Sequence, residues 1–190
     1  MSEQSFGIGV FVRAVCFAAE KHRHQRRKDA EASPYINHPI ALANVLATEG
    51  GISDPTVLCA AVLHDTIEDT QTTAEELESI FGPAVASIVL EVTDDKALEK
   101  PVRKERQIEH AAHLSPQAKL VKLADKICNL RDTLASPPAN WSADRKRTYF
   151  DWAAQVVGGV RGAHPGLEAV FDGIYARGAD FPEEAREQGV

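Results

Sequence analysis

A seven-residue segment near the middle of the chain, His64 to Thr70 (HDTIEDT), concentrates side chains that bind metals and move protons. If the segment is helical, His64 and Glu68 lie one turn apart, and so do Asp65 and Asp69. The preceding apolar residues 60–63 predict a buried approach to this cluster. Because charges beside a buried run are costly unless something compensates them, the segment favours a divalent cation site over a purely structural role.

Two other segments offer ligands of the same kind. His38 lies between restricted backbone positions at the expected start of a helix, just before a proline. Asp125 interrupts the apolar helix expected over residues 119–131 and falls one turn before Asn129, so the two side chains share a face. Asp125 could instead pair with Lys122 or Arg131. The pattern as a whole favours a ligand role.

Two histidines and two aspartates give a mixed nitrogen and oxygen ligand set that suits Mn²⁺, Fe²⁺ or Zn²⁺. The set is His38, His64, Asp65 and Asp125. Four protein ligands leave positions open on an octahedral ion, and water there becomes acidic enough to supply hydroxide for attack on phosphorus. Glu68 and Asp69 follow the His-Asp pair by one turn, where they can orient that water and accept its proton.

The elements that must position these residues are predicted to be helices, because apolar side chains recur with helical spacing and alternate little. A first helix precedes the basic segment 21–28, and a second runs from about His38 to Gly50. Later helices are expected to begin at Asp54-Pro55, Thr73, Pro83, Pro101, Ser115-Pro116 and Ser142. We expect an all-α bundle in which the helix that opens at Pro55 also carries the segment 64–70.

Length and composition narrow the functional classes. With 190 residues and 44% hydrophobic content, the chain can bury one core, so a single domain over residues 1–190 is expected. A net charge of -7 argues against non-specific nucleic-acid binding. Three widely spaced cysteines predict a reducing cytoplasm rather than a disulfide framework. Neither a secretory signal nor a membrane-spanning run is expected, which leaves a small molecule as the partner.

The order of the motifs resembles the HD phosphohydrolase superfamily and, within it, the hydrolase domain of RelA/SpoT-type alarmone enzymes. The segments that carry the resemblance are 22–28, 34–39, 64–70, 91–96 and 119–131. The short chain and the segment 152–157 look most like the stand-alone small alarmone hydrolases, including the metazoan SpoT homologues. The resemblance covers about residues 10–178 and implies a single-domain helical bundle of the HD type.

The resemblance implies removal of the 3′-pyrophosphate from guanosine 3′,5′-bis(diphosphate) (ppGpp), or from its pentaphosphate relative, with Mn²⁺ and release of GDP or GTP. By position, His38, His64, Asp65 and Asp125 would be metal ligands, and Glu68 and Asp69 the catalytic acids. Substrate contacts would come from Arg27 and Lys28 at the nucleotide, Asn129 at the ribose, and Arg145 and Tyr149 on a closing helix.

The sequence also departs from the long alarmone enzymes. The loop from Lys28 to Pro34 is longer and has Ala32 and Ser33 where a glycine is common, and Cys128 and Asp132 replace residue types that are frequent there. Two other functions stay open: a broader nucleotide phosphohydrolase, such as one that removes the 2′-phosphate of NADPH, and a non-catalytic alarmone-binding protein. The intact acidic and ligand candidates favour an enzyme.

Overall fold

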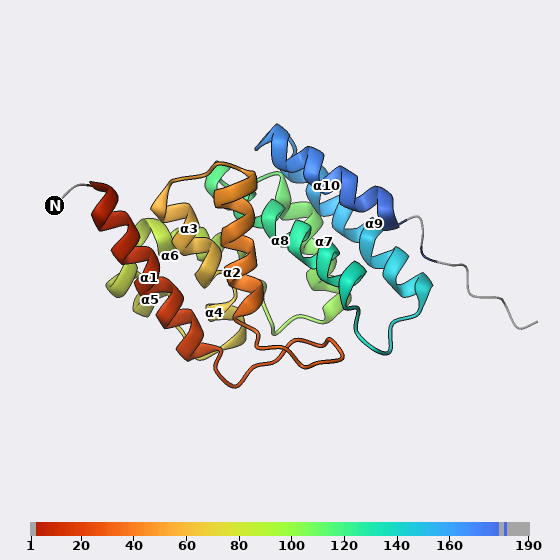
Figure 1. The fold of residues 1–190 in the computed structure, drawn as a ribbon, viewed down its shortest axis with the longest axis horizontal. Coiled ribbons are helices and arrows are strands. Elements are labelled where there is room, and N and C mark those ends of the chain that lie inside the picture. Colours follow the sequence, from red (N-terminus) through yellow and green to blue (C-terminus); the bar gives the residue numbers. More distant parts are fainter. Residues whose placement is uncertain (1–2, 179–180, 182–190) are drawn as a thin grey trace, which may run out of the picture.

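The computed structural model describes residues 3–178 and 181, and the regular structure in this part of the chain is helical (Figure 1). The helices are α1 (Glu3–Lys21), α2 (Asn37–Asn44), the π-helical turn η1 (Val45–Glu49), α3 (Pro55–Leu63), α4 (Thr66–Asp69), α5 (Ala74–Phe81), α6 (Pro83–Val92), α7 (Lys100–Ala111), α8 (Pro116–Ala135), α9 (Ala143–Val160) and α10 (Pro165–Arg177). The predicted all-α class is confirmed. Among the described helices, none combines the length and apolar character needed to cross a membrane.

Most helix starts lie where capping signals predicted them. Asp54 caps α3 by accepting a hydrogen bond from the backbone nitrogen of Thr56 at 2.8 Å. Thr73, Ser115 and Ser142 cap α5, α8 and α9 in the same way. Such caps satisfy backbone N–H groups that have no partner inside the helix, which makes them readable from local sequence.

The predicted continuous helix through residues 55–70 is wrong. α3 ends at Leu63, and the short helix α4 begins only at Thr66. The Thr66 hydroxyl donates to the carbonyl oxygen of Leu63 at 2.7 Å, and Asp65 takes φ -99° and ψ 0° between the two helices. A threonine side chain that bonds a nearby carbonyl competes with the helix ladder. The resulting turn lets His64 and Asp65 face the same point, with Nε2 and Oδ2 2.9 Å apart.

The loop between α1 and α2, residues 22–36, folds back on itself. An isolated β-bridge joins Arg26 to Pro34, and the backbone nitrogen of Arg27 donates to the carbonyl oxygen of Ser33 at 2.9 Å. Ala32 has φ of 49°, a conformation that glycine adopts without strain. The bridge therefore fixes the base of the longer loop noted in the sequence, although alanine occupies a position that suits glycine.

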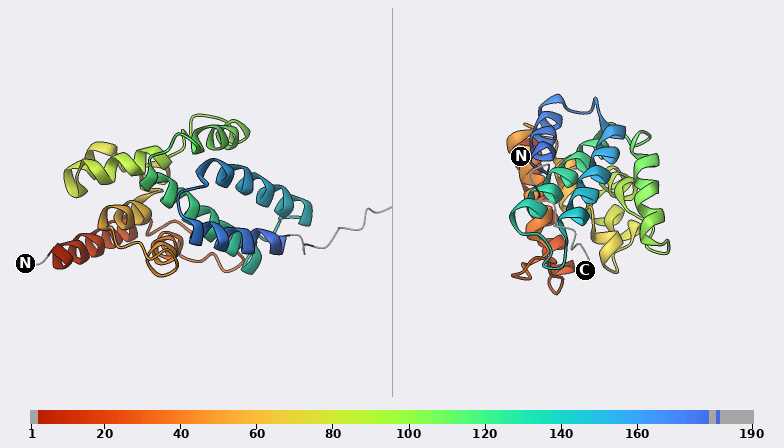
Figure 2. Two further views of the ribbon diagram at one scale, coloured as in Figure 1. Left: turned by 90° about the horizontal axis from the view of Figure 1, so that it is seen from above. Right: turned by 90° about the vertical axis from the view of Figure 1, so that its right-hand side faces the viewer.

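Two helices form the centre of the molecule. α3 is apolar on all sides, and it packs against α1, α2, α6 and α8. α8 continues the core towards α9 and α10, and the two views in Figure 2 show the later helices gathered around it. Three charged residues of α8, Lys122, Asp125 and Lys126, are nevertheless buried. Buried charges require partners, and these lie at the site described below.

α7 and α9 approach one another closely. A Cβ atom on Gly159 of α9 would lie 2.6 Å from the Cβ atom of Ala111 in α7. Only a residue without a side chain allows this spacing at position 159. The contact matters for the site because α7 carries Lys100 and Lys104 and α9 carries Arg145.

Candidate active site

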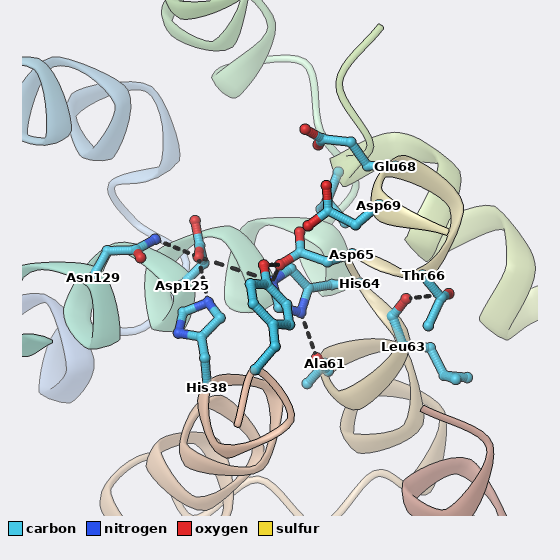
Figure 3. Close-up of polar contacts among 12 residues, drawn as sticks. His38, Ala61, Leu63, His64, Asp65, Thr66, Glu68, Asp69, Asp125 and Asn129 are labelled. Carbon is cyan, nitrogen blue, oxygen red and sulfur yellow. Dashed lines mark hydrogen bonds and ion pairs between the residues drawn. The ribbon is translucent and has the colours of Figure 1, made fainter. Parts of the chain in front are cut away.

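Residues from three separate parts of the chain converge at the predicted metal site (Figure 3). His38 comes from α2, His64 and Asp65 from the turn after α3, and Asp125 from α8. Nε2 of His38 lies 3.3 Å from Oδ1 of Asp125, and Nε2 of His64 lies 4.0 Å from the same oxygen. One ligand atom each of His38, His64 and Asp65 falls within 4.8 Å of the others. The structure therefore brings the four candidates together.

The orientation of His64 fits a metal ligand. Its Nδ1 lies 2.8 Å from the carbonyl oxygen of Ala61, which can only accept a hydrogen bond. The ring proton is thus held on Nδ1, and Nε2 presents its lone pair to the cluster. This Nε2 is buried and makes no hydrogen bond of good geometry, although Oδ2 of Asp65 lies 2.9 Å away. A buried imidazole nitrogen without a proton donor, next to two carboxylates, is the donor set that a divalent cation completes.

Electrostatics favour a cation at the same point. Burial favours the protonated forms of Asp65 and Asp125, but His64 beside the first and Lys126 beside the second hold the pKa of each carboxyl well below its usual range. Burial also opposes charge on His64, yet the charges of Asp65 and Asp125 raise its pKa to about 8. A proton and a metal ion therefore compete for this cluster.

The candidate ligands are themselves held by hydrogen bonds. The Tyr35 hydroxyl donates to Oδ2 of Asp65. Asn129 donates to Oδ1 of Asp125 at 2.6 Å, which confirms that these two side chains share a face of α8. Asp125 also pairs with Lys126 at 3.0 Å rather than with Lys122 or Arg131. Such outer contacts fix the direction of the oxygen lone pairs and support metal affinity.

Glu68 and Asp69 lie beside the cluster but have different neighbours. Oε2 of Glu68 accepts from the backbone nitrogen of Asp94 at 3.3 Å, and Oε1 lies 3.4 Å from Arg103. Burial, followed by the charges of Asp94 and Asp65, raises the pKa of Glu68 to about 7. Asp69 accepts from Gln25 at 2.7 Å and pairs with Lys96. A carboxyl group with a pKa near neutrality suits proton transfer.

A cavity of about 690 Å³ opens next to the cluster and is lined by His38 and Asp69. We call it the nucleotide cavity after the substrate contacts that the sequence predicted. All five residues predicted from the sequence to contact substrate line it: Arg27, Lys28, Asn129, Arg145 and Tyr149. The guanidinium of Arg145 stands 4.8 Å from the centre of the Trp141 ring, and that ring contacts Tyr149. The cavity therefore combines positive charge with aromatic faces, which suits a phosphorylated nucleotide.

Sequence reasoning missed part of this lining. Lys100 and Lys104 of α7 also face the nucleotide cavity, as does Trp141. Burial and the neighbouring cations Lys28 and Arg145 lower the pKa of Lys100, and burial and Lys100 lower that of Lys104. The cations that line this cavity outnumber its carboxylates, which favours an anionic ligand. In the sequence, these lysines look like any exposed helical pair, so no local signal could have identified them.

The HD domain family matches residues 14–151. This chain belongs to the HD domain family. The HD domain match includes every site residue predicted from the sequence, from Arg27 to Tyr149.

Two relatives within the family are similar over most of their length. A Danio rerio protein named guanosine-3′,5′-bis(diphosphate) 3′-pyrophosphohydrolase MESH1 is 59% identical over 166 residues, which cover 87% of this chain and 92% of that protein. The Homo sapiens protein of the same name is 56% identical over 162 residues, covering 85% and 90%. A solved structure described as a metazoan orthologue of SpoT that hydrolyses ppGpp has a TM-score of 0.86 and 46% identity, and it covers 93% of this chain and 96% of its own.

Proposed function

We propose that the protein hydrolyses ppGpp, releasing pyrophosphate and GDP, and that it acts on the pentaphosphate relative to give GTP. The observation that carries the proposal is the junction between the His-Asp cluster and the cation-rich nucleotide cavity. A nucleotide with diphosphates at two positions needs several cations at one end and a metal at the other. The relatives reported above, whose names state this activity, support the same substrate.

His38, His64, Asp65 and Asp125 would hold a divalent cation, and we propose Mn²⁺ because mixed imidazole and carboxylate ligands suit it. A bound cation supplies Lewis acidity and makes water a better nucleophile near neutral pH. Glu68, with its pKa near 7, would accept the proton from that water.

The nucleotide cavity would position the rest of the substrate. Arg27, Lys28 and Arg145 carry guanidinium and ammonium groups that bind phosphate oxygens, and Lys100 and Lys104 add to them. Stacking surfaces for the base come from Trp141 and Tyr149. The Asn129 side chain, already bonded to Asp125, lies where a ribose next to the metal would contact it.

A second candidate substrate is NADPH, with loss of its 2′-phosphate. The cavity favours this alternative in one respect, since its cations recognise phosphate groups and about 690 Å³ accommodates more than one kind of nucleotide. The two candidates require the same ligands and the same Glu68. They differ only in what fills the nucleotide cavity.

A comparative turnover assay tests the proposal. Purified protein is incubated with ppGpp, its pentaphosphate relative, NADPH and GTP, with and without Mn²⁺, and pyrophosphate and phosphate are measured. We expect pyrophosphate from the two alarmones only when Mn²⁺ is present, with His64→Ala inactive. His113→Ala, which changes an exposed histidine, is the matched control. Release of phosphate from NADPH, without release of pyrophosphate from ppGpp, would show that the proposed substrate is wrong. Tight binding of ppGpp without turnover would indicate a binding protein.

A further inference from the structure

The candidate metal ligands also line a group of hollows that is separate from the nucleotide cavity. The inner hollow measures about 50 Å³, and three of the four candidate ligands, His64, Asp65 and Asp125, line it together with Glu68. The fourth candidate, His38, lines the nucleotide cavity instead. No residue lines both spaces. The cluster therefore lies between two separate cavities.

An outer hollow of about 160 Å³ lies next to the inner hollow. The two hollows share four lining residues: Val92, Asp94, Gln107 and Lys122. The far wall of the outer hollow includes Asp95, Arg106 and His110, which are exposed. We call the two hollows together the rear channel.

The rear channel and the nucleotide cavity differ in charge. The nucleotide cavity has six cationic side chains, Arg26, Arg27, Lys28, Lys100, Lys104 and Arg145, against three carboxylates, Asp29, Asp69 and Asp132. The outer hollow has three cationic side chains, Arg103, Arg106 and Lys122, against three carboxylates, Glu91, Asp94 and Asp95. The inner hollow adds three carboxylates, Asp65, Glu68 and Asp125, and one further cation, Lys126, so carboxylates outnumber cations in the rear channel as a whole. A polyanionic nucleotide therefore prefers the nucleotide cavity, and the rear channel suits water.

Lys122 gives the inner hollow a polar wall. The residue is 8% exposed, and its ammonium donates to the carbonyl oxygen of Val92 at 3.0 Å. Among the described residues, no carboxylate lies within ion-pair distance of it, although an ammonium has three donors. A polar hollow of about 50 Å³ is large enough for ordered water, for which about 10–15 Å³ suffices.

We propose that the rear channel admits the water that attacks the substrate, and that this water lies in the inner hollow between the candidate ligands and Glu68. The inference rests on the proposed function. In phosphoryl transfer the attacking and leaving oxygens lie on opposite sides of phosphorus, roughly in line. With the nucleoside in the nucleotide cavity, the leaving 3′ oxygen points into that cavity, so the attacking oxygen enters from the rear channel.

The step balances with the groups present. The water oxygen forms a bond to the phosphorus next to the ribose, and its proton passes to Glu68, which lines the inner hollow. The bond between that phosphorus and the 3′ oxygen breaks, and the 3′ oxygen takes a proton from solvent in the nucleotide cavity. Asp69 lines the nucleotide cavity and not the inner hollow, so its place is on the nucleotide side. The two neighbouring acids therefore have different tasks.

Water-proton relaxation of the Mn²⁺-loaded protein tests the channel without any turnover. Val121 lines the inner hollow, and Val121→Phe places a larger side chain there. Val102→Phe, at a 39% exposed position of α7, is the control. Saturation of the wild type with GDP should leave most of the relaxation enhancement in place, because water still reaches the ion from the rear. In Val121→Phe, GDP should remove it, while Val102→Phe behaves like the wild type.

Kinetics supply a second measurement that does not depend on Val121→Phe folding. Lys122→Met keeps the length of the side chain and removes the ammonium from the inner hollow, so kcat should fall about ten-fold, with KM changed less than about two-fold. Lys104→Met, in the nucleotide cavity, should show the reverse: a higher KM with kcat nearly unchanged. Thermal melts of each variant establish that it is folded.

The possible results distinguish failure of the channel proposal from failure of the proposed function. Loss of the relaxation enhancement when GDP binds to the wild type would overturn the channel, since water would then enter only by the nucleotide cavity. A Lys122→Met variant with raised KM and unchanged kcat would also overturn it. If no nucleotide were hydrolysed but Val121→Phe still lowered the number of exchanging waters on Mn²⁺ in the nucleotide-free protein, the channel would stand and the proposed function would fail.

Discussion

Arg27 and Asp132 form an ion pair across one wall of the nucleotide cavity, with the guanidinium nitrogen 2.5 Å from the carboxylate oxygen. Arg27 lies in the loop after α1, and Asp132 lies on α8. The guanidinium also stands 5.7 Å from the centre of the Tyr35 ring. The pair ties the loop after α1 to the central helix α8.

Arg27→Ala should weaken nucleotide binding. Loss of one charge-assisted hydrogen bond to phosphate costs about 1.5–3 kcal/mol, so KM should rise about ten-fold or more with kcat little changed. Arg161→Ala is the control, because Arg161 pairs with Asp172 on an exposed surface. Steady-state kinetics over a range of nucleotide concentrations measure the effect. Equal KM values for the two variants would remove Arg27 from the binding site.

His64→Ala and Asp65→Ala should abolish metal binding and turnover together. Each substitution removes a donor atom from the cluster, and a divalent ion held by fewer protein ligands dissociates more readily. Calorimetric titration of the metal-free protein with Mn²⁺ measures the affinity directly. Because a ligand that binds only the folded state stabilises it, Mn²⁺ should also raise the melting temperature of the wild type and not of these variants. An unchanged Mn²⁺ affinity would show that the ion lies elsewhere.

Glu68→Gln should separate metal binding from chemistry. The amide keeps the size of the side chain but cannot accept a proton, so kcat should fall about 10²–10⁴-fold, the usual contribution of a positioned general base. Mn²⁺ affinity should stay within a few-fold of the wild type, because Glu68 is not among the four candidate ligands. Glu75→Gln, at an exposed helix start, is the matched control. Normal turnover by Glu68→Gln would show that another group accepts the proton of the attacking water.

The stability of the metal-free protein should depend on pH through Glu68. Burial, then Asp94 and Asp65, raises the pKa of this carboxyl from 4.5 to about 7, so the folded state binds the proton more tightly than the unfolded state. The contribution to stability is complete below about pH 4.5 and is lost as the pH rises to about 7.

Glu68→Gln removes this titration, so the difference in urea midpoint between variant and wild type should grow in favour of the variant from pH 4.5 to pH 7 and then level off. Taking the difference cancels the other titrating groups, including His64. A midpoint difference that stays flat across this interval would place the Glu68 carboxylate in a more polar setting than the structure shows.

Local chemistry explains what could be predicted from the sequence. The caps at Asp54, Thr73 and Ser115 each bond a backbone group within three residues, so a short stretch of sequence contains the whole interaction. The four candidate ligands were also identified without coordinates, because His and Asp in apolar surroundings are uncommon without a partner.

The errors have physical causes as well. α10 was not predicted because its cap is the ring nitrogen of His164, which accepts from Leu167 at 3.1 Å, and histidine is not among the usual capping residues. The break after Leu63 depends on one threonine rotamer. The roles of Lys100 and Lys104 depend on where α7 lies against the other helices, and the rear channel is lined by residues of four helices, α4, α6, α7 and α8. Neither the roles of these lysines nor the rear channel can be predicted from a short segment of sequence.

The close contact between Gly159 and Ala111 has a consequence for how this enzyme could diversify. It sets the separation of α7 and α9, and cations of both helices line the nucleotide cavity. A larger residue at position 159 would increase the distance between α7 and α9. Lys100, Lys104 and Arg145, which these helices carry, would move with them. Position 159 is not part of the cavity lining, so a substitution there would alter the cavity without exchange of a charged side chain.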